Sequence, residues 1–105
     1  MGKSSQRKGA NGERELAEVL REYGYDIQRG GSETFGKVPD LIGLPSVHIE
    51  CQRVEHLNLW EAMEQSIRDA ERFQDGFPTV VFRRNRSNWL IALRLSDFMS
   101  IFKGE

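Results

Sequence analysis

The segment VPDLIGLPSVHIECQRVE, residues 38–55, holds two short apolar runs with an acid in the middle of each. Asp40 lies in the first run and Glu50 in the second. Residues 40–43 and 47–53 are expected to form strands joined by a turn at residues 44–46. Carboxylates are rarely buried without a partner. The two acids are therefore expected to face either solvent or a bound cation.

Alternation along residues 47–53 gives this strand two different faces, because successive side chains point to opposite sides. The apolar face, expected in the core, carries Val47, Ile49 and Cys51. The polar face carries His48, Glu50 and Gln52. We expect Cys51 to be a small core residue, and His48 to be a surface histidine rather than a metal ligand.

The pairing of the two strands decides what the acids face. If they form an antiparallel hairpin with Gly43 opposite Val47, Asp40 lies directly opposite Glu50. Two carboxylates about 5 Å apart repel by roughly 3 kcal/mol at an effective dielectric of 20. A cation would relieve that repulsion, and an all-oxygen pair suits Mg²⁺. Two acids on the wet face of a hairpin are a common alternative, and a register shift of one residue removes the argument.

The rest of the chain predicts the order helix, three strands, helix, two strands, short helix, an α/β (α+β) domain with one sheet. The predicted helices are residues 9–23, residues 59–73 with Asn58 as the cap, and a C-terminal helix capped by Ser96. The other strands are residues 25–29, 79–84 and 88–94, the last two forming a hairpin. Residues 1–8 are expected to be a flexible basic segment, and residues 9–105 a single domain.

Composition limits the classes of protein that this chain of 105 residues can be. The single cysteine, Cys51, excludes an internal disulfide and a cysteine-based zinc site, and it suits a reducing cytoplasm. No apolar run approaches the ~20 residues that a membrane span needs, and the N-terminus lacks a signal-peptide core. We therefore expect a cytoplasmic protein without membrane contact.

The distribution of charge is more informative than the net charge of −1. Residues 1–14 carry four basic residues and one acid, and residues 78–95 carry four arginines and no acid. Two basic clusters on a nearly neutral protein indicate localised contact with a polyanion. For the arginine cluster, a solvated hairpin tip is an equally good interpretation.

Glu13 lies on the apolar stripe of the first predicted helix, three and seven residues before Leu16 and Leu20. It either frays into solvent at the first turn, where the helix dipole favours a carboxylate, or it points at the same site as Asp40 and Glu50. Trp60 and Trp89 are expected in the core or an interface rather than as platforms for nucleic-acid bases.

Four segments together resemble the PD-(D/E)xK nuclease superfamily: KGANGEREL (8–16), VPDLIGL (38–44), HIECQRVE (48–55) and LWEAMEQS (59–66). The most similar members are the archaeal-type Holliday-junction resolvases and their phage-encoded relatives. The resemblance implies a restriction-endonuclease-like domain with a central mixed five-stranded sheet flanked by helices, in the order αβββαββα. It also implies a homodimer that cuts four-way DNA junctions in recombination and repair, with Mg²⁺ or Mn²⁺ and no small-molecule cofactor.

Position by position, the resemblance implies a catalytic set of Glu13, Asp40, Glu50 and Gln52. The metal ligands would be Asp40, Glu50 and the backbone carbonyl of Cys51, with Glu13 acting through a water. Residues that would contact DNA are Lys3, Arg7, Lys8, Arg14, Arg29, Ser32, Lys37, Arg53, Gln65, Arg83, Arg84 and Arg86.

Gln52 departs from the family, which has lysine at this position. A lysine ammonium would orient the attacking water and offset phosphate charge, whereas glutamine donates hydrogen bonds but brings no charge and cannot act as a base. Three hypotheses stay open: an active junction resolvase, a branched-DNA-binding protein inactivated at position 52 by a natural or engineered change, and a duplex-nicking repair or restriction nuclease. A protein-interaction domain with incidental acids is disfavoured.

Overall fold

The computed structural model describes residues 2–30 and 38–104, with side chains from residue 11 onward. The elements follow the predicted order and confirm the α/β (α+β) class. They are α1 (Gly2–Glu22), β1 (Gln28–Arg29), β2 (Leu41–Ile42), β3 (Val47–Arg53), α2 (Leu59–Phe73), β4 (Phe77–Arg83), β5 (Leu90–Leu93) and α3 (Leu95–Lys103). None of the described helices is long and apolar enough to cross a bilayer.

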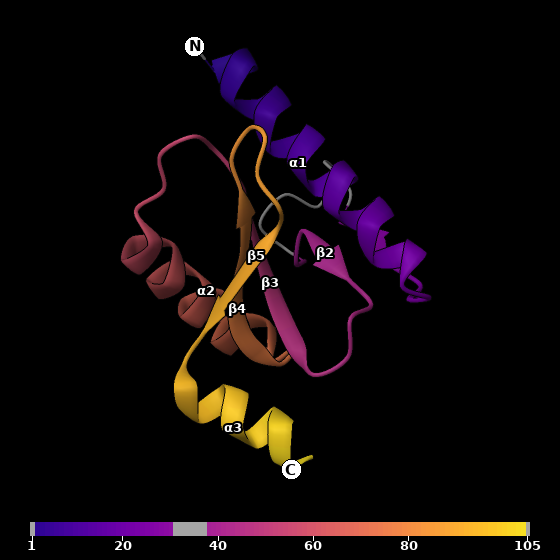
Figure 1. Cartoon of the computed structure of the whole chain (residues 1–105), viewed down its shortest axis with the longest axis vertical. Helices are drawn as coiled ribbons and strands as arrows, with labels where there is room; N and C mark the ends of the chain where they lie inside the picture. Colours follow the sequence, from indigo (N-terminus) through magenta and orange to yellow (C-terminus); the bar gives the residue numbers. More distant parts are fainter. Residues whose placement is uncertain (1, 31–37, 105) are drawn as a thin grey trace.

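The five strands form two sheets rather than one. The larger sheet has the order β3-β4-β5, with β3 and β4 parallel and β4 and β5 antiparallel. Helix α2 makes the crossover that a parallel pair requires, and the predicted hairpin of the last two strands is confirmed. Strands β1 and β2 form a separate antiparallel pair. In Figure 1, α1 and α2 lie on opposite sides of the larger sheet, and α3 lies beyond the end away from the β4–β5 turn.

The predicted antiparallel pairing of residues 40–43 with 47–53 is wrong, because β2 pairs with β1 and β3 pairs with β4. Gly43 explains the difference. Its φ is +122°, and a Cβ there would lie 2.2 Å from the Asp26 carbonyl oxygen, so the chain after β2 passes directly against the segment before β1. Only glycine permits that approach and that backbone conformation. Asp40 is therefore not the ladder neighbour of Glu50, and their closeness depends on how the two sheets pack.

The core forms between α1 and the apolar face of β3, as the alternation predicted. Its buried members come from α1, from the residue before β1 and from both sheets: Leu16, Ala17, Ile27, Leu41, Ile49 and Val81, with Val47 and Cys51 packed against them. The other face of the larger sheet is covered by α2, where the Ser66 hydroxyl donates to the Thr79 carbonyl at 2.7 Å. Strand β3 thus presents its polar face toward α2.

The helix ends test the predicted caps. Helix α2 has the predicted bounds, and the Asn58 side chain accepts a hydrogen bond from the Glu61 amide at 3.1 Å. Helix α1 begins at Gly2 instead of about Gly9. The Ser96 cap is wrong, because α3 starts at Leu95 and its cap position is Arg94, two residues before the predicted cap. Asp97 in the first turn complements the positive end of the helix and accepts from Arg94 Nε at 2.8 Å.

Candidate functional site

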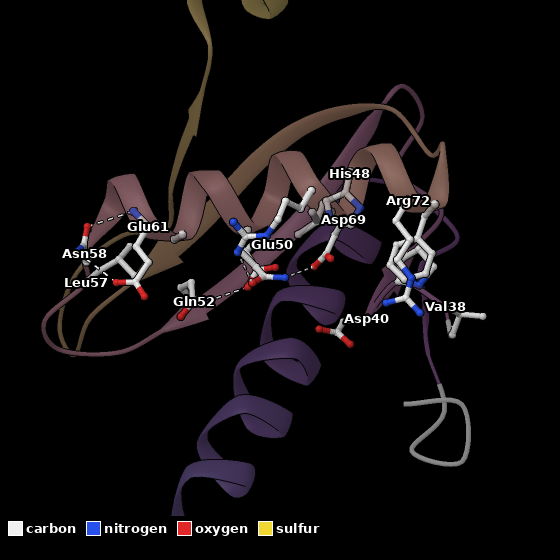
Figure 2. A pocket seen from close by; sticks show the side chains of 16 residues that line it. Val38, Asp40, His48, Glu50, Gln52, Leu57, Asn58, Glu61, Asp69 and Arg72 are labelled. Atoms are coloured by element: carbon white, nitrogen blue, oxygen red, sulfur yellow. Dashed lines mark hydrogen bonds between the residues drawn. The ribbon is translucent and has the colours of Figure 1, made fainter. Parts of the chain in front are cut away.

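A cavity of about 580 Å³ lies between the polar face of β3 and α2, with residues 38–40 at one edge. Strand β3 contributes His48, Glu50 and Gln52, and α2 contributes Gln65 and Asp69. In Figure 2, Glu50, Asp69 and Asp40 gather around one space from three separate segments of the chain. The cavity is therefore lined mainly by polar side chains, with acids concentrated in one part of it.

Glu50 lies half-buried in the middle of this cavity. Burial raises the pKa of its carboxyl, and the nearby Asp40 and Asp69 carboxylates raise it further. Gln52 acts in the opposite direction, because its Nε2 donates to Glu50 Oε2 at 2.8 Å and stabilises the charged form. Gln52 is thus hydrogen-bonded directly to Glu50.

Glu13 points at this site rather than fraying into solvent. Because α1 begins at Gly2, Glu13 lies well inside the helix and is partly buried. Burial raises the pKa of its carboxyl to about 7, and the adjacent Asp40 carboxylate adds to the rise, which Arg29 partly offsets. Asp40 is exposed by surface area, yet partial desolvation of its carboxyl raises its pKa, with Asp69 as the next cause. Acids from α1, β3 and α2 and from the residue before β2 therefore influence one another's ionisation, with Arg29 beside them and Arg68 and Arg72 also lining the cavity.

His48 is not the surface residue that the sequence predicted. Its side chain is only 2% exposed, because Phe73 of α2 stacks on the ring at a centroid distance of 6.3 Å. Nδ1 lies 2.9 and 2.8 Å from the two carboxylate oxygens of Asp75. Nε2 is buried and has no hydrogen-bond partner among the described residues. Leaving a buried polar atom unpaired costs roughly 1–3 kcal/mol.

Asp69 is the acid that the sequence reasoning missed. It accepts a hydrogen bond from Gln65 Nε2 at 2.9 Å. Within the described residues, His48, Glu50 and Asp69 are the one set of three whose metal-binding atoms all lie within 4.8 Å of one another. The available sequence signal is spacing, because Asp69 follows Gln65 by four residues and so shares its helix face.

Cys51 faces away from the cavity, on the apolar side of β3. Burial raises the pKa of its thiol to about 12, with Glu13 as the next cause, so the thiol stays neutral and behaves as a small core group. Its backbone carbonyl stays a predicted metal ligand.

Two of the predicted DNA-contacting arginines are held within the protein. Arg53 pairs with Glu15 at 3.5 Å and with Glu55 at 3.9 Å, and it donates to Asn85 Oδ1 at 2.9 Å. Arg83 also pairs with Glu15, and its guanidinium lies over Trp89. These contacts join the end of β3, the β4–β5 turn and α1.

The other predicted contacts differ in accessibility. Arg14 is exposed on α1, and Arg84 and Arg86 are exposed at the β4–β5 turn, where Ser87 Oγ donates to the Arg84 carbonyl. Arg29 is partly buried, close to Glu13 and Asp40. Trp60 is 82% exposed and so is not a core residue. The side chains of Lys3, Arg7 and Lys8, and the residues Ser32 and Lys37, lie outside the described part of the chain.

Comparison with known families identifies the class of this protein. Residues 4–104 match the family model described as "Phage putative PDDEXK endonuclease". The chain therefore belongs to this family of PD-(D/E)xK endonucleases, as its motifs predicted. No relative was found among curated proteins.

The fold is similar to that of Hjc, a Holliday junction resolvase from the archaeal hyperthermophile Archaeoglobus fulgidus. The TM-score is 0.60 at 22% sequence identity, and the match covers 82% of this chain and 72% of Hjc. At this identity the similarity concerns the fold, and it confirms the predicted Hjc-like α/β domain.

PD-(D/E)xK nucleases use divalent metal ions, and the donor set of this site fits such an ion. Oxygen atoms of Glu50 and Asp69 lie within 4.8 Å of each other and of a His48 nitrogen, and burial and neighbouring acids raise the pKa of Glu13, Asp40 and Glu50. A divalent cation beside these acids would offset their mutual repulsion and favour the ionised carboxylates.

Proposed function

We propose that this protein is a structure-selective endodeoxyribonuclease that hydrolyses DNA at four-way junctions with a divalent cation. The observation that carries the proposal is that Glu13 on α1, Asp40 before β2 and Glu50 on β3 lie close enough for Asp40 and Glu50 to raise the pKa of Glu13. Membership of the endonuclease family supports phosphodiester hydrolysis. The fold shared with a Holliday junction resolvase favours the branched substrate.

Asp40 and Glu50 would hold Mg²⁺, or Mn²⁺ as the alternative, together with the carbonyl of Cys51, and Glu13 would act through a water. When bound, such an ion polarises the scissile phosphate and lowers the pKa of a water. Asp40 is exposed at the edge of the cavity, so a metal ion that it holds would be accessible to a large substrate such as DNA. Glu50 suits a fixed ligand, because it is more buried and held on a strand.

Gln52 is proposed to position the attacking water. Its Nε2 bonds to Glu50 Oε2, so its carbonyl oxygen is the end of the amide that can accept a hydrogen bond from a water. An amide cannot remove a proton or offset phosphate charge, so we expect slower cleavage than a lysine would give.

The neutral Gln52 also favours a second candidate function, a protein of the same fold that binds branched DNA without cutting it. The Gln52–Glu50 hydrogen bond stabilises the ionised Glu50 without adding any positive charge beside the phosphate. Such a protein would keep its DNA-binding surface and lose only phosphodiester hydrolysis.

DNA contact is proposed to run mainly through the phosphate backbone, with exposed Arg14, Arg84 and Arg86 as the best-placed described residues. Arg53 and Arg83 fit a supporting role better, because acids of this chain already pair with them. The proposed assembly is a homodimer, which matches the two-fold symmetry of a junction, acting in recombination or repair in the host cytoplasm.

The test incubates the protein with a labelled four-way junction and a matched duplex, in Mg²⁺ or in Ca²⁺. Symmetric nicks that appear only on the junction, and only with Mg²⁺, would support the resolvase. Junction binding without cuts in any metal would favour the binding protein. Equal cutting of both substrates would indicate a nuclease that nicks duplex DNA without selecting junctions.

A further inference from the structure

We infer that His48, Glu50 and Asp69 form a second divalent-cation site, which prefers a later first-row transition metal such as Co²⁺ or Zn²⁺ over Mg²⁺. Their ligand atoms already lie within 4.8 Å of one another. Ligands on one ion of this kind lie roughly 3–4 Å apart at metal–ligand distances of about 2.0–2.2 Å, so small side-chain rotations close the set. Asp40 is not part of this set.

The strongest observation is the state of the His48 ring. Its Nε2 is buried without a partner among the described residues, while Nδ1 faces both oxygens of Asp75. If Nδ1 carries the proton and donates it to Asp75, Nε2 has a free lone pair. A carboxylate behind a histidine is the usual arrangement around a metal-binding imidazole, because it fixes the tautomer and raises the basicity of the ligand.

The surroundings hold the ring in this orientation. Phe73 stacks on the imidazole, and Arg72 lies 4.9 Å from the Phe73 ring centre. On the same helix, Gln65 Nε2 donates to Asp69 Oδ2, which leaves the other oxygen of that carboxylate available. Figure 2 shows the three side chains meeting from β3 and α2. Two ligands are thus oriented before any ion binds.

Ligand chemistry determines the preference for the metal. Mg²⁺ favours an all-oxygen octahedral environment, whereas imidazole nitrogen favours later first-row ions. A set of one nitrogen and two carboxylates therefore differs from the all-oxygen set proposed around Asp40. Glu50 belongs to both sets and would bridge two ions. Any role of this second ion in DNA cleavage rests on the proposed function, whereas the site itself is inferred from the positions of its own side chains.

The test is binding of Co²⁺ alone to the full-length chain without DNA, followed by visible absorption and calorimetry. Wild-type protein should give a cobalt spectrum with a nitrogen ligand, and an excess of Mg²⁺ should not abolish it. His48→Asn keeps a donor for Asp75 but has no atom at the Nε2 position. We expect His48→Asn and Asp69→Asn each to weaken Co²⁺ binding at least about 100-fold, and Asp75→Asn to weaken it about 10-fold.

Two control variants define the site. Glu64→Gln removes an exposed acid from α2 outside the cavity, and Asp40→Asn removes the ligand proposed for Mg²⁺. Both should keep the cobalt spectrum, with affinity changed no more than a few-fold. Circular dichroism checks that each variant folds, and Asp69→Asn, at a partly exposed helix position, covers the case in which His48→Asn does not fold.

Three outcomes would overturn the inference: no Co²⁺ binding by the wild type, unchanged binding in both His48→Asn and Asp69→Asn, or equal loss in Asp40→Asn and Asp69→Asn, which would indicate one shared ion. None of these depends on cleavage. Failure of the proposed function would instead appear as an absence of junction cleavage with any metal, whatever the cobalt spectrum.

Discussion

Glu13→Gln should stabilise the metal-free protein at high pH and leave its stability unchanged at low pH. The Glu13 carboxyl has a pKa of about 7 in the folded protein, raised from 4.5. The folded state therefore binds more protons than the unfolded state between these values, so stability falls as pH rises through this window. For a fully buried carboxyl, a pKa shift of this size would lower the free energy of unfolding at high pH by roughly 3 kcal/mol, at 1.36 kcal/mol per pK unit. Because Glu13 is only half-buried, solvent screening reduces this to about 1–2 kcal/mol.

The assay is thermal unfolding in a metal chelator at pH 4 and at pH 8. At pH 8 the variant should melt about 4–10 °C above the wild type, and at pH 4 the two should coincide. Glu18→Gln is the matched control, because Glu18 is exposed on the same helix and should give no pH-dependent difference. Equal stabilisation at both pH values, or none at pH 8, would refute the view that Glu13 lies among unneutralised acids.

Three further predictions address the chemistry and the packing. Gln52→Lys should raise Mg²⁺-dependent junction cleavage by at least about 10-fold, because it adds a charge beside the phosphate; an unchanged rate would remove this side chain from catalysis. Asp40→Asn should abolish cleavage while keeping or tightening junction binding in Ca²⁺, measured by gel mobility shift; retained turnover would exclude Asp40 from the mechanism. Ser66→Ala should cost about 1–3 kcal/mol in urea unfolding, because the fully buried Thr79 carbonyl loses its donor; a change below about 0.5 kcal/mol would contradict that.

Local patterns predicted the parts of the fold that depend on neighbouring residues. The alternation along residues 47–53 identified β3 and its apolar face, and Asn58 marked the start of α2 through its own side-chain hydrogen bond. Strand pairing was different, because β1 and β2 have two residues each and contain too little pattern to choose a partner. Their pairing depends on the contact between Gly43 and the Asp26 backbone, which joins distant residues.

The same distinction holds for the candidate site. Motifs at recognisable spacing proposed Glu13, Asp40 and Glu50, whose catalytic roles stay predictions; in the structure Asp40 and Glu50 both raise the pKa of Glu13, although the assumed register was wrong. His48 and Asp69 were missed as site residues, because their roles depend on α2 covering one end of β3. A polar residue that alternates on a strand looks solvent-exposed in the sequence until the helix that covers it is known.

The most direct measurement is anomalous scattering from crystals of the protein soaked in Mn²⁺. The account predicts an ion coordinated jointly by the carboxylates of Asp40 and Glu50, at about 2.0–2.3 Å from each. The absence of an ion shared by Asp40 and Glu50, whether or not a second ion lies at His48, Glu50 and Asp69, would contradict it.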